Sequence, residues 1–297
     1  MRLATARAPE PHGGASALFA AGTGGYYHVS SAALAAGVTA LAGMADVGDL
    51  LRAGDGARVA LATLVAELDA VGDPGVALDK LDLLPPVLAP RALVCIGRNY
   101  AEHVAEGKAE MPAYPLLFSK FLNALAGHPA RVAYPAITKE LDYEGELAVV
   151  IGRRASRVRE QDAFDHVAGY TIVNDLSARD LQARDLQWIR AKSLDGFAPL
   201  GPCVLTADEV ADVDALRIQT RVNGELRQDE VAGAMHFKIP RLLAFITEGI
   251  TLEPGDVVAT GTPSGVGLGF DPPRYLARGD VVEVTIEPIG VLRADVV

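Results

Sequence analysis

Cysteine, aromatic residues and positive charge are all scarce in this 297-residue sequence, and each shortage excludes a class of protein. The two cysteines, Cys95 and Cys203, form no CxxC pair and no Cys/His cluster, which argues against a disulfide framework or a zinc finger. Aromatic residues make up 6% of the chain, so we expect an aliphatic core. A net charge of −11 disfavours nucleic acid as a partner.

Long hydrophobic runs are missing as well. No stretch reaches the length of a membrane span, and residues 1–7 lack the apolar core of a signal peptide. We therefore expect a soluble, cytoplasmic protein with no membrane partner. Half of the residues are hydrophobic and 22% are charged, which suits one large domain, either alone or with a small companion.

The residue composition of the chain changes after residues 83–90. This segment is proline-rich, which predicts an extended linker. Before this linker the chain is rich in alanine and glycine, with helical patterns over residues 31–36 and 57–68. We predict a small N-terminal α/β domain over residues 1–88, which supports packing or a dimer. A larger domain over residues 89–297 follows it.

The larger domain is predicted to be β-dominated, and the fold class is therefore α+β. Residues 240–248 carry its clearest helical pattern, and Asn223-Gly224 is a strong signal for a two-residue hairpin. Short apolar runs separated by glycine and proline predict strands at residues 92–96, 147–151, 166–173, 216–222, 256–260 and 281–286.

Glu144 and Glu146 lie at the start of one of these apolar runs. Side chains two residues apart on a strand point to the same face, so two carboxylates would project side by side where water is scarce. They cannot both stay ionised there without a compensating cation. Oxygen ligands favour Mg²⁺ or Mn²⁺ over zinc, with Ca²⁺ as a further candidate.

Asp175 closes the predicted strand 166–173 and offers a third carboxylate. Strand-end carboxylates from two strands can converge on one hard cation. Taken alone, Asp175 is better explained as a turn residue or as the cap of a helix that begins in Asp-Leu-Ser-Ala-Arg. Together with the glutamate pair, it favours a metal site.

His103 and Glu106 lie three residues apart after the predicted strand 92–96. On a helix they are neighbours, and a carboxylate beside an imidazole fixes its tautomer and raises its basicity. That arrangement suits a base that activates water. The motif His-x-x-Glu is common by chance, however, and a solvated helix face is an equal alternative on this evidence alone.

Two further segments carry polar groups that suit an anion. Lys192, between an aromatic residue and a glycine turn, could stabilise a developing negative charge, although an ordinary surface lysine is the plainer alternative. The segment 259–267 places glycines around hydroxyl residues, so its N–H groups could cradle a carboxylate. A simple β-turn would give the same pattern.

Five segments, in this order and spacing, resemble the fumarylacetoacetate hydrolase family over about two thirds of the chain. The resemblance is weak before residue 90. Gly145 departs from it, because we expect a larger apolar residue between the two glutamates. The segments are GRNYAEHVAEG, LDYEGELAVVIGR, VNDLSARDLQ, WIRAKSLDGFAPLGP and GTPSGVG.

The resemblance implies a mixed β-roll or sandwich, usually a homodimer, with the metal site at one end. It implies that His103 and Glu106 form the catalytic dyad on a mobile lid, with Lys192 as a third catalytic residue. The metal ligands it implies are Glu144, Glu146 and Asp175. The substrate-binding positions it implies are Arg98, Tyr100, Gln182, Gly261 and Thr262.

The reaction that we predict from this resemblance is metal-assisted hydrolysis of a C–C bond in a β-diketo acid, an acylpyruvate-like compound of aromatic or sugar-acid catabolism. His103 would activate water, and Lys192 would hold the pyruvate-type enolate that leaves. The same site also suits decarboxylation, isomerisation or tautomerisation of an oxo-diacid such as oxaloacetate or a 2-hydroxymuconate. A ligand-binding relative without chemistry is a third alternative, and it would be expected to lack one of these residues.

Overall fold

A large β-sheet runs through the whole molecule. The computed structural model describes residues 1–8 and 14–297, and in these the sheet has the strand order β3-β2-β1-β13-β11-β10-β16-β5-β6. Two short strands, β4 and β7, pair with β1 and β13. The strands are β1 (Arg2–Arg7), β2 (Ser16–Ala21), β3 (Tyr26–His28), β4 (Leu83–Leu84), β5 (Leu93–Gly97), β6 (Leu116–Ser119), β7 (Leu125–Ala126), β10 (Gly145–Ile151), β11 (Val167–Asn174), β13 (Ala198–Thr206) and β16 (Val257–Ala259).

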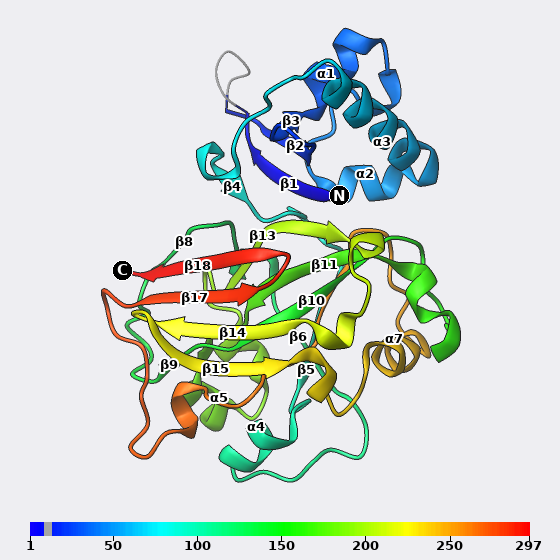
Figure 1. Cartoon of the computed structure of the whole chain (residues 1–297). Helices are drawn as coiled ribbons and strands as arrows, with labels where there is room; N and C mark the ends of the chain where they lie inside the picture. Colours follow the sequence, from blue (N-terminus) through cyan, green and yellow to red (C-terminus); the bar gives the residue numbers. More distant parts are fainter. Residues whose placement is uncertain (9–13) are drawn as a thin grey trace.

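A second sheet packs against the middle of the first (Figure 1). Its order is β15-β14-β17-β18-β8, and its inward side chains, such as Ile218 and Val284, share a core with Leu147 and Ile172 of the first sheet. Alternating burial along β14 and β17 reflects this one-sided packing. Its strands are β8 (Ala130–Val132), β14 (Arg217–Val222), β15 (Glu225–Val231), β17 (Val281–Ile286) and β18 (Gly290–Val296).

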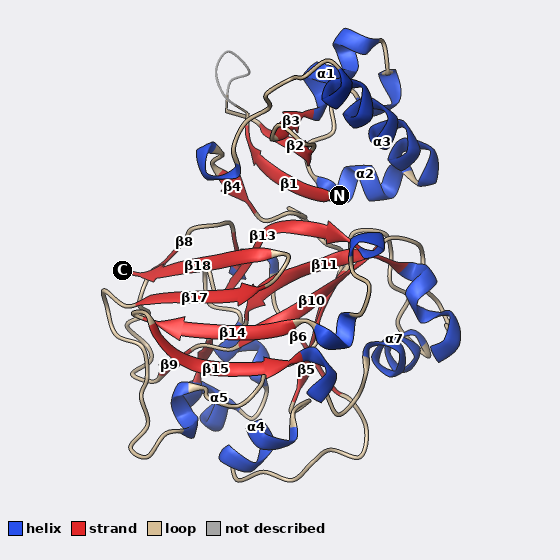
Figure 2. Ribbon diagram, in the orientation of Figure 1, coloured by secondary structure: helices blue, strands red, loops and turns tan. Residues whose placement is uncertain are grey.

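Helices lie at the edges and around one end of the two sheets (Figure 2). They are α1 (Val29–Ala36), α2 (Val47–Ala53), α3 (Asp55–Ala70), α4 (Ala101–Glu106), α5 (Arg179–Asp185), α6 (Trp188–Lys192) and α7 (Ile239–Thr247). A small two-stranded sheet, β9 (Leu141–Asp142) with β12 (Ser177–Ala178), lies near α5. None of the described helices combines the length and apolar composition that a bilayer crossing requires.

The predicted fold class is confirmed, and each of the six predicted strands forms. Strand β10 is buried along its entire length, as a continuous apolar run requires in the middle of two packed layers. Asn223 and Gly224 both have positive φ, 51° and 81°, which is the backbone of the predicted two-residue hairpin turn. Helices α1, α3 and α7 occupy the segments with helical patterns.

The N-terminal region, residues 1–88, is joined to the rest through the large sheet. Leu3 of β1 pairs with Val204 of β13, so the N-terminal strands extend the same sheet. Helices α1, α2 and α3 cover them, with Leu50 and Leu61 buried in a core that also includes Val204. The boundary at residue 88 stays a prediction, and no linker separates two independent sheets here.

Candidate active site

Three carboxylates converge where β10 begins and β11 ends. Glu144, Glu146 and Asp175 each place an oxygen within 4.8 Å of the other two, and all three are buried. The antiparallel pairing of β10 with β11 causes this, because Gly145 faces Asn174 and the Asp175 amide donates to the Glu144 carbonyl at 2.8 Å. One detail differs from the prediction, since Glu144 precedes the first residue of β10.

Gly145, the expected site of a larger residue, has no room for a side chain. A Cβ there would lie 2.2 Å from Thr220 Oγ1 and 2.9 Å from a methyl group of Val284. These two residues belong to β14 and β17, so the second sheet approaches β10 closely at this point. Glycine therefore lets the sandwich close directly behind the two glutamates.

Two buried lysines hold Asp175. Lys192 Nζ donates to Asp175 Oδ2 at 2.7 Å, to Glu144 Oε2 at 3.0 Å and to Ser177 Oγ at 2.8 Å. Lys120, which the sequence analysis missed, bonds to the other oxygen of Asp175 and donates to the Leu176 carbonyl at 3.1 Å. The surface-lysine alternative for Lys192 is wrong, because its side chain is 2% exposed.

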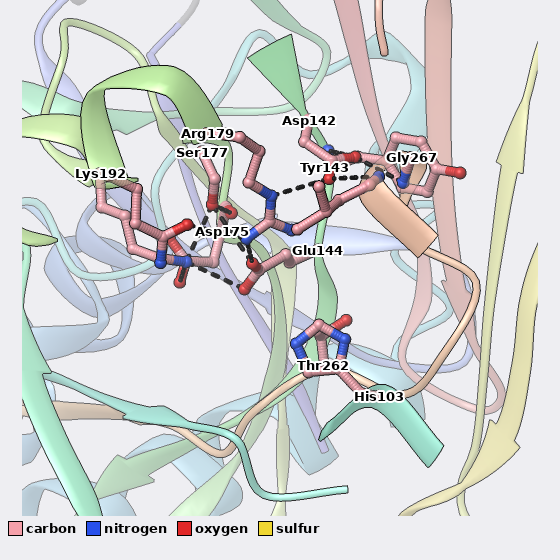
Figure 3. Close-up of polar contacts among 12 residues, drawn as sticks. His103, Asp142, Tyr143, Glu144, Asp175, Ser177, Arg179, Lys192, Thr262 and Gly267 are labelled. Carbon is pink, nitrogen blue, oxygen red and sulfur yellow. Dashed lines mark hydrogen bonds and ion pairs between the residues drawn. The ribbon is translucent and has the colours of Figure 1, made fainter. Parts of the chain in front are cut away.

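Arg179 is the third buried cation of the cluster and was also missed. Its Nε donates to Asp142 Oδ2 at 2.8 Å, and its Nη1 lies 2.7 Å from Glu144 Oε1 (Figure 3). Asp142 in turn accepts hydrogen bonds from the amides of Gly267 and Leu268, at 2.6 and 3.0 Å. The Gly-rich segment 259–267 is thereby tied to the glutamate pair.

The two glutamates have opposite electrostatic surroundings. Burial alone would raise the pKa of Glu144, but the charges of Lys192 and Arg179 outweigh it, and the pKa lies below its ordinary value. Burial raises the pKa of Glu146, and the neighbouring Asp175 and Glu144 raise it further. Within residues 1–8 and 14–297, no lysine or arginine forms an ion pair with Glu146. A hard divalent cation fits this gap, because all three donors are carboxylates.

The predicted contact between His103 and Glu106 is present. His103 Nδ1 lies 3.0 Å from Glu106 Oε1 on α4, and the imidazole points toward Glu144 (Figure 3). Glu106 also accepts a hydrogen bond from the Gly265 amide at 2.9 Å, which ties α4 to segment 259–267. A carboxylate that accepts from Nδ1–H leaves Nε2 free to take a proton.

A cavity of 430 Å³ opens beside this cluster. Of the predicted site residues, those that line it are Arg98, His103, Glu144, Gln182, Lys192 and Thr262. The other predicted site residues, Tyr100, Glu106, Glu146, Asp175 and Gly261, do not line it. Tyr100, the residue before α4, is buried in the core between the two sheets, and the Gly261 amide donates to Glu146 Oε2 at 2.9 Å. Gly261 therefore supports Glu146, whereas the buried Tyr100 hydroxyl has no hydrogen-bond partner among the described residues.

Comparison with protein families gives one match that covers most of the chain. The family model described as "Fumarylacetoacetate (FAA) hydrolase C-terminal" matches residues 92–297. Those residues include every carboxylate, lysine and histidine of the site described above.

Two similar curated proteins carry the same named activity. An oxaloacetate tautomerase of Bacillus subtilis (strain 168) is 46% identical over 228 residues, which are 75% of this chain and 76% of that protein. A mitochondrial oxaloacetate tautomerase of Homo sapiens is 42% identical over 236 residues, 79% of this chain and 74% of that protein.

Two solved structures resemble the whole chain. The fumarylacetoacetate hydrolase from the psychrophilic Exiguobacterium antarcticum has a TM-score of 0.79 at 34% identity, covering 100% of this chain and 99% of that one. A 5-carboxymethyl-2-hydroxymuconate delta-isomerase from Mycobacterium smegmatis has a TM-score of 0.74 at 32% identity, with the same coverage.

Proposed function

The chain belongs to the fumarylacetoacetate hydrolase family, and on that premise we propose that it is a metal-dependent tautomerase of a 2-oxo diacid such as oxaloacetate. The observation that carries this proposal is the identity of 42 to 46%, over three quarters of the chain, with oxaloacetate tautomerases. This favours the alternative reaction of the sequence analysis over the C–C hydrolysis that was its main prediction.

Glu144, Glu146 and Asp175 would hold the cation, which we propose to be Mg²⁺ or Mn²⁺, with Ca²⁺ as a weaker candidate. When bound, it would withdraw electrons from a chelated 2-oxo acid and so make the adjacent C–H more acidic. Lys192 and Lys120 together hold both oxygens of Asp175, which fixes the direction in which this carboxylate can point.

His103 would move the proton. In the keto form, its Nε2 would take a proton from C3, while Glu106 holds the imidazole by the opposite nitrogen. The same proton, or one from water, then goes to the oxygen on C2, so that the enol forms with no change in composition. Lys192 would stabilise the negative charge that develops on that oxygen. Gln182 and Thr262, which line the cavity, would position the substrate.

The direct test follows the interconversion of oxaloacetate forms by ultraviolet absorbance and NMR, with Mg²⁺ present. We expect the protein to speed enol-to-keto conversion, and the His103→Ala variant to lose this effect while still binding metal. Carbon dioxide and pyruvate as the only products would contradict tautomerisation and would indicate decarboxylation.

Hydrolysis of an acylpyruvate is a second candidate, favoured by the His103–Glu106 contact of 3.0 Å. The same dyad could remove a proton from water as well as from carbon, and water would then attack the distal carbonyl. Incubation with acetylpyruvate separates the two activities. Release of acetate and pyruvate at a rate comparable to oxaloacetate turnover would establish hydrolysis.

We also propose that the protein is a cytoplasmic homodimer and that residues 1–88 support the fold rather than the chemistry. None of the carboxylates, lysines or histidines of the site lies before residue 90, which agrees with this division of roles. Light scattering during size-exclusion chromatography would give the oligomeric state. A monomeric mass at micromolar concentration would contradict the dimer.

A further inference from the structure

The turn after β5 is held by buried hydrogen bonds and places an arginine in an unfavourable backbone conformation. Arg98 has φ 56°, in the left-handed region that residues with a side chain rarely adopt. The next residue, Asn99, is buried and fixes the turn. Its Nδ2 donates to the Phe237 and Thr260 carbonyls at 3.0 and 2.8 Å, and its Oδ1 accepts from the Phe237 amide at 2.8 Å.

Trp188 fixes the direction of the Arg98 side chain. The residue before Arg98 is Gly97, where a Cβ would lie 2.4 Å from the Trp188 ring, so the backbone rests directly on the indole. The Arg98 guanidinium carbon lies 5.8 Å from the centre of the same ring. Stacking on an aromatic ring restrains a guanidinium and leaves its N–H groups available at the edge.

Arg98 differs from the other two cations that line the cavity. Arg179 and Lys192 are buried, and each is already paired with carboxylates. Arg98 is exposed and forms no ion pair within the described part of the chain. Backbone strain of this kind is typically retained at functional positions. A strained, aromatic-stacked and unpaired arginine facing an active-site cavity has the properties of an anion-binding group.

We propose that Arg98 binds the second carboxylate of the substrate and thereby selects four-carbon dicarboxylates over monocarboxylates of the same length. This inference rests on the proposed function, which places the 2-oxo acid end at the carboxylate cluster beside Lys192. The remaining carboxylate must then lie elsewhere in the same cavity. A guanidinium can bind this carboxylate with two parallel hydrogen bonds, whereas the neutral amide of Gln182 supplies no charge.

Binding of a matched pair of unreactive acids tests this without any turnover. Malate and 2-hydroxybutanoate have the same chain length and the same chelating end, and they differ by a terminal carboxylate in place of a methyl group. Titration calorimetry with the Mg²⁺-loaded protein should show malate bound about 10- to 100-fold more tightly, as one charge-assisted contact predicts. In Arg98→Met that preference should fall to about twofold or less, and in Arg98→Lys it should be intermediate.

Two controls separate loss of the Arg98 charge from damage to the fold. Arg98→Met leaves a side chain with the same backbone penalty, and an unchanged melting temperature would show that the turn is intact. Arg278→Met is the matched control, because Arg278 also stacks on a ring, at 5.5 Å from the Tyr134 centre, but does not line the cavity. It should keep the full preference for malate.

Two outcomes would overturn the assignment. One is a wild-type protein that binds malate and 2-hydroxybutanoate equally. The other is an Arg98→Met variant that loses affinity for both acids by the same factor, because Arg98 would then hold the shared chelating end or the fold. Absence of oxaloacetate tautomerisation would refute the proposed function alone, since this preference in binding is measured without a reaction.

Discussion

An ion pair in the N-terminal region, Arg7 with Asp82, is exposed to water, whereas the ion pair between Lys120 and Asp175 is buried. Arg7 and Asp82 lie 3.2 Å apart with 58% and 71% of their side chains exposed. Lys120 and Asp175 form their ion pair with none of either side chain exposed. Exposed pairs contribute little to stability, whereas buried ions lose several kcal/mol of hydration each. Buried charges such as Lys120 and Asp175 are therefore better evidence of function than of stability.

The difference extends to how each region is built. Around α3 the buried residues are aliphatic, such as Leu61 and Leu64, and the charges lie on the outer face. Around Asp175, on the side of the large sheet turned away from the second sheet, the interior contains carboxylates, lysines and an arginine that depend on one another. Removing one member there leaves its partners buried and uncompensated, whereas truncating an aliphatic residue such as Leu61 alters only local packing.

Replacing Lys192 with Met should have the largest effect. Glu144 and Asp175 would lose a shared donor in a buried position, so the free energy of unfolding should fall by about 3–5 kcal/mol. Turnover should drop to background, because the group opposite the developing enolate charge is gone. Urea unfolding and the oxaloacetate assay measure the two losses. Wild-type stability in this variant would contradict the buried network.

Replacing His103 with Ala should affect activity and leave stability nearly unchanged. Loss of a positioned proton-transfer group typically lowers the rate by about 10²- to 10⁴-fold. Glu106→Gln should show a smaller loss, because the imidazole remains but its orientation is less well fixed. Steady-state kinetics on the two variants give both numbers, and an equal loss of metal affinity in either would argue for a structural role instead.

Leu61→Ala in α3 should have the opposite effect, because it should lower stability and leave activity nearly unchanged. Truncation of a buried leucine costs about 2–5 kcal/mol, so the melting temperature should fall clearly. The kcat of the folded protein at low temperature should stay within about twofold of wild type. A large fall in kcat under conditions where the variant is fully folded would show that residues 1–88 shape the active site.

Arg7→Met should have the smallest effect. Its ion pair with Asp82 is solvent-exposed, so the free energy of unfolding should change by less than about 1 kcal/mol. Lys192→Met and Arg7→Met each remove one ion-pairing cation, the first from a buried site and the second from an exposed one. Similar losses of stability in the two variants would remove the contrast between the regions.

Local patterns in the sequence were enough to predict six of the strands, the hairpin and the carboxylate cluster, but not β1, β2 or β13. Glu144, Glu146 and Asp175 lie beside continuous apolar runs, so their burial follows from strand length alone. The contact between His103 and Glu106 follows in the same way from helical spacing.

The partners that the sequence analysis missed are those brought in by tertiary contacts. Lys120 follows a short strand and looks like a surface residue, yet it reaches Asp175, 55 positions further along the chain. Arg179 and Asp142 both lie in segments that resemble the family, but only the pairing of β9 with β12 brings them together. The pairing of β1 with β13, which joins the N-terminal region to the large sheet, likewise has no signal in local periodicity.

Titration calorimetry of the protein with Mg²⁺ and with Mn²⁺, in wild type and in Glu146→Gln, tests the central claim most directly. The substitution keeps the shape of the side chain and removes the one carboxylate of the cluster that has no cationic partner in the described structure. We predict one equivalent of metal bound by wild type and at least 100-fold weaker binding by the variant, with its fold intact. Equal metal affinity in the two proteins would contradict a metal site at this cluster.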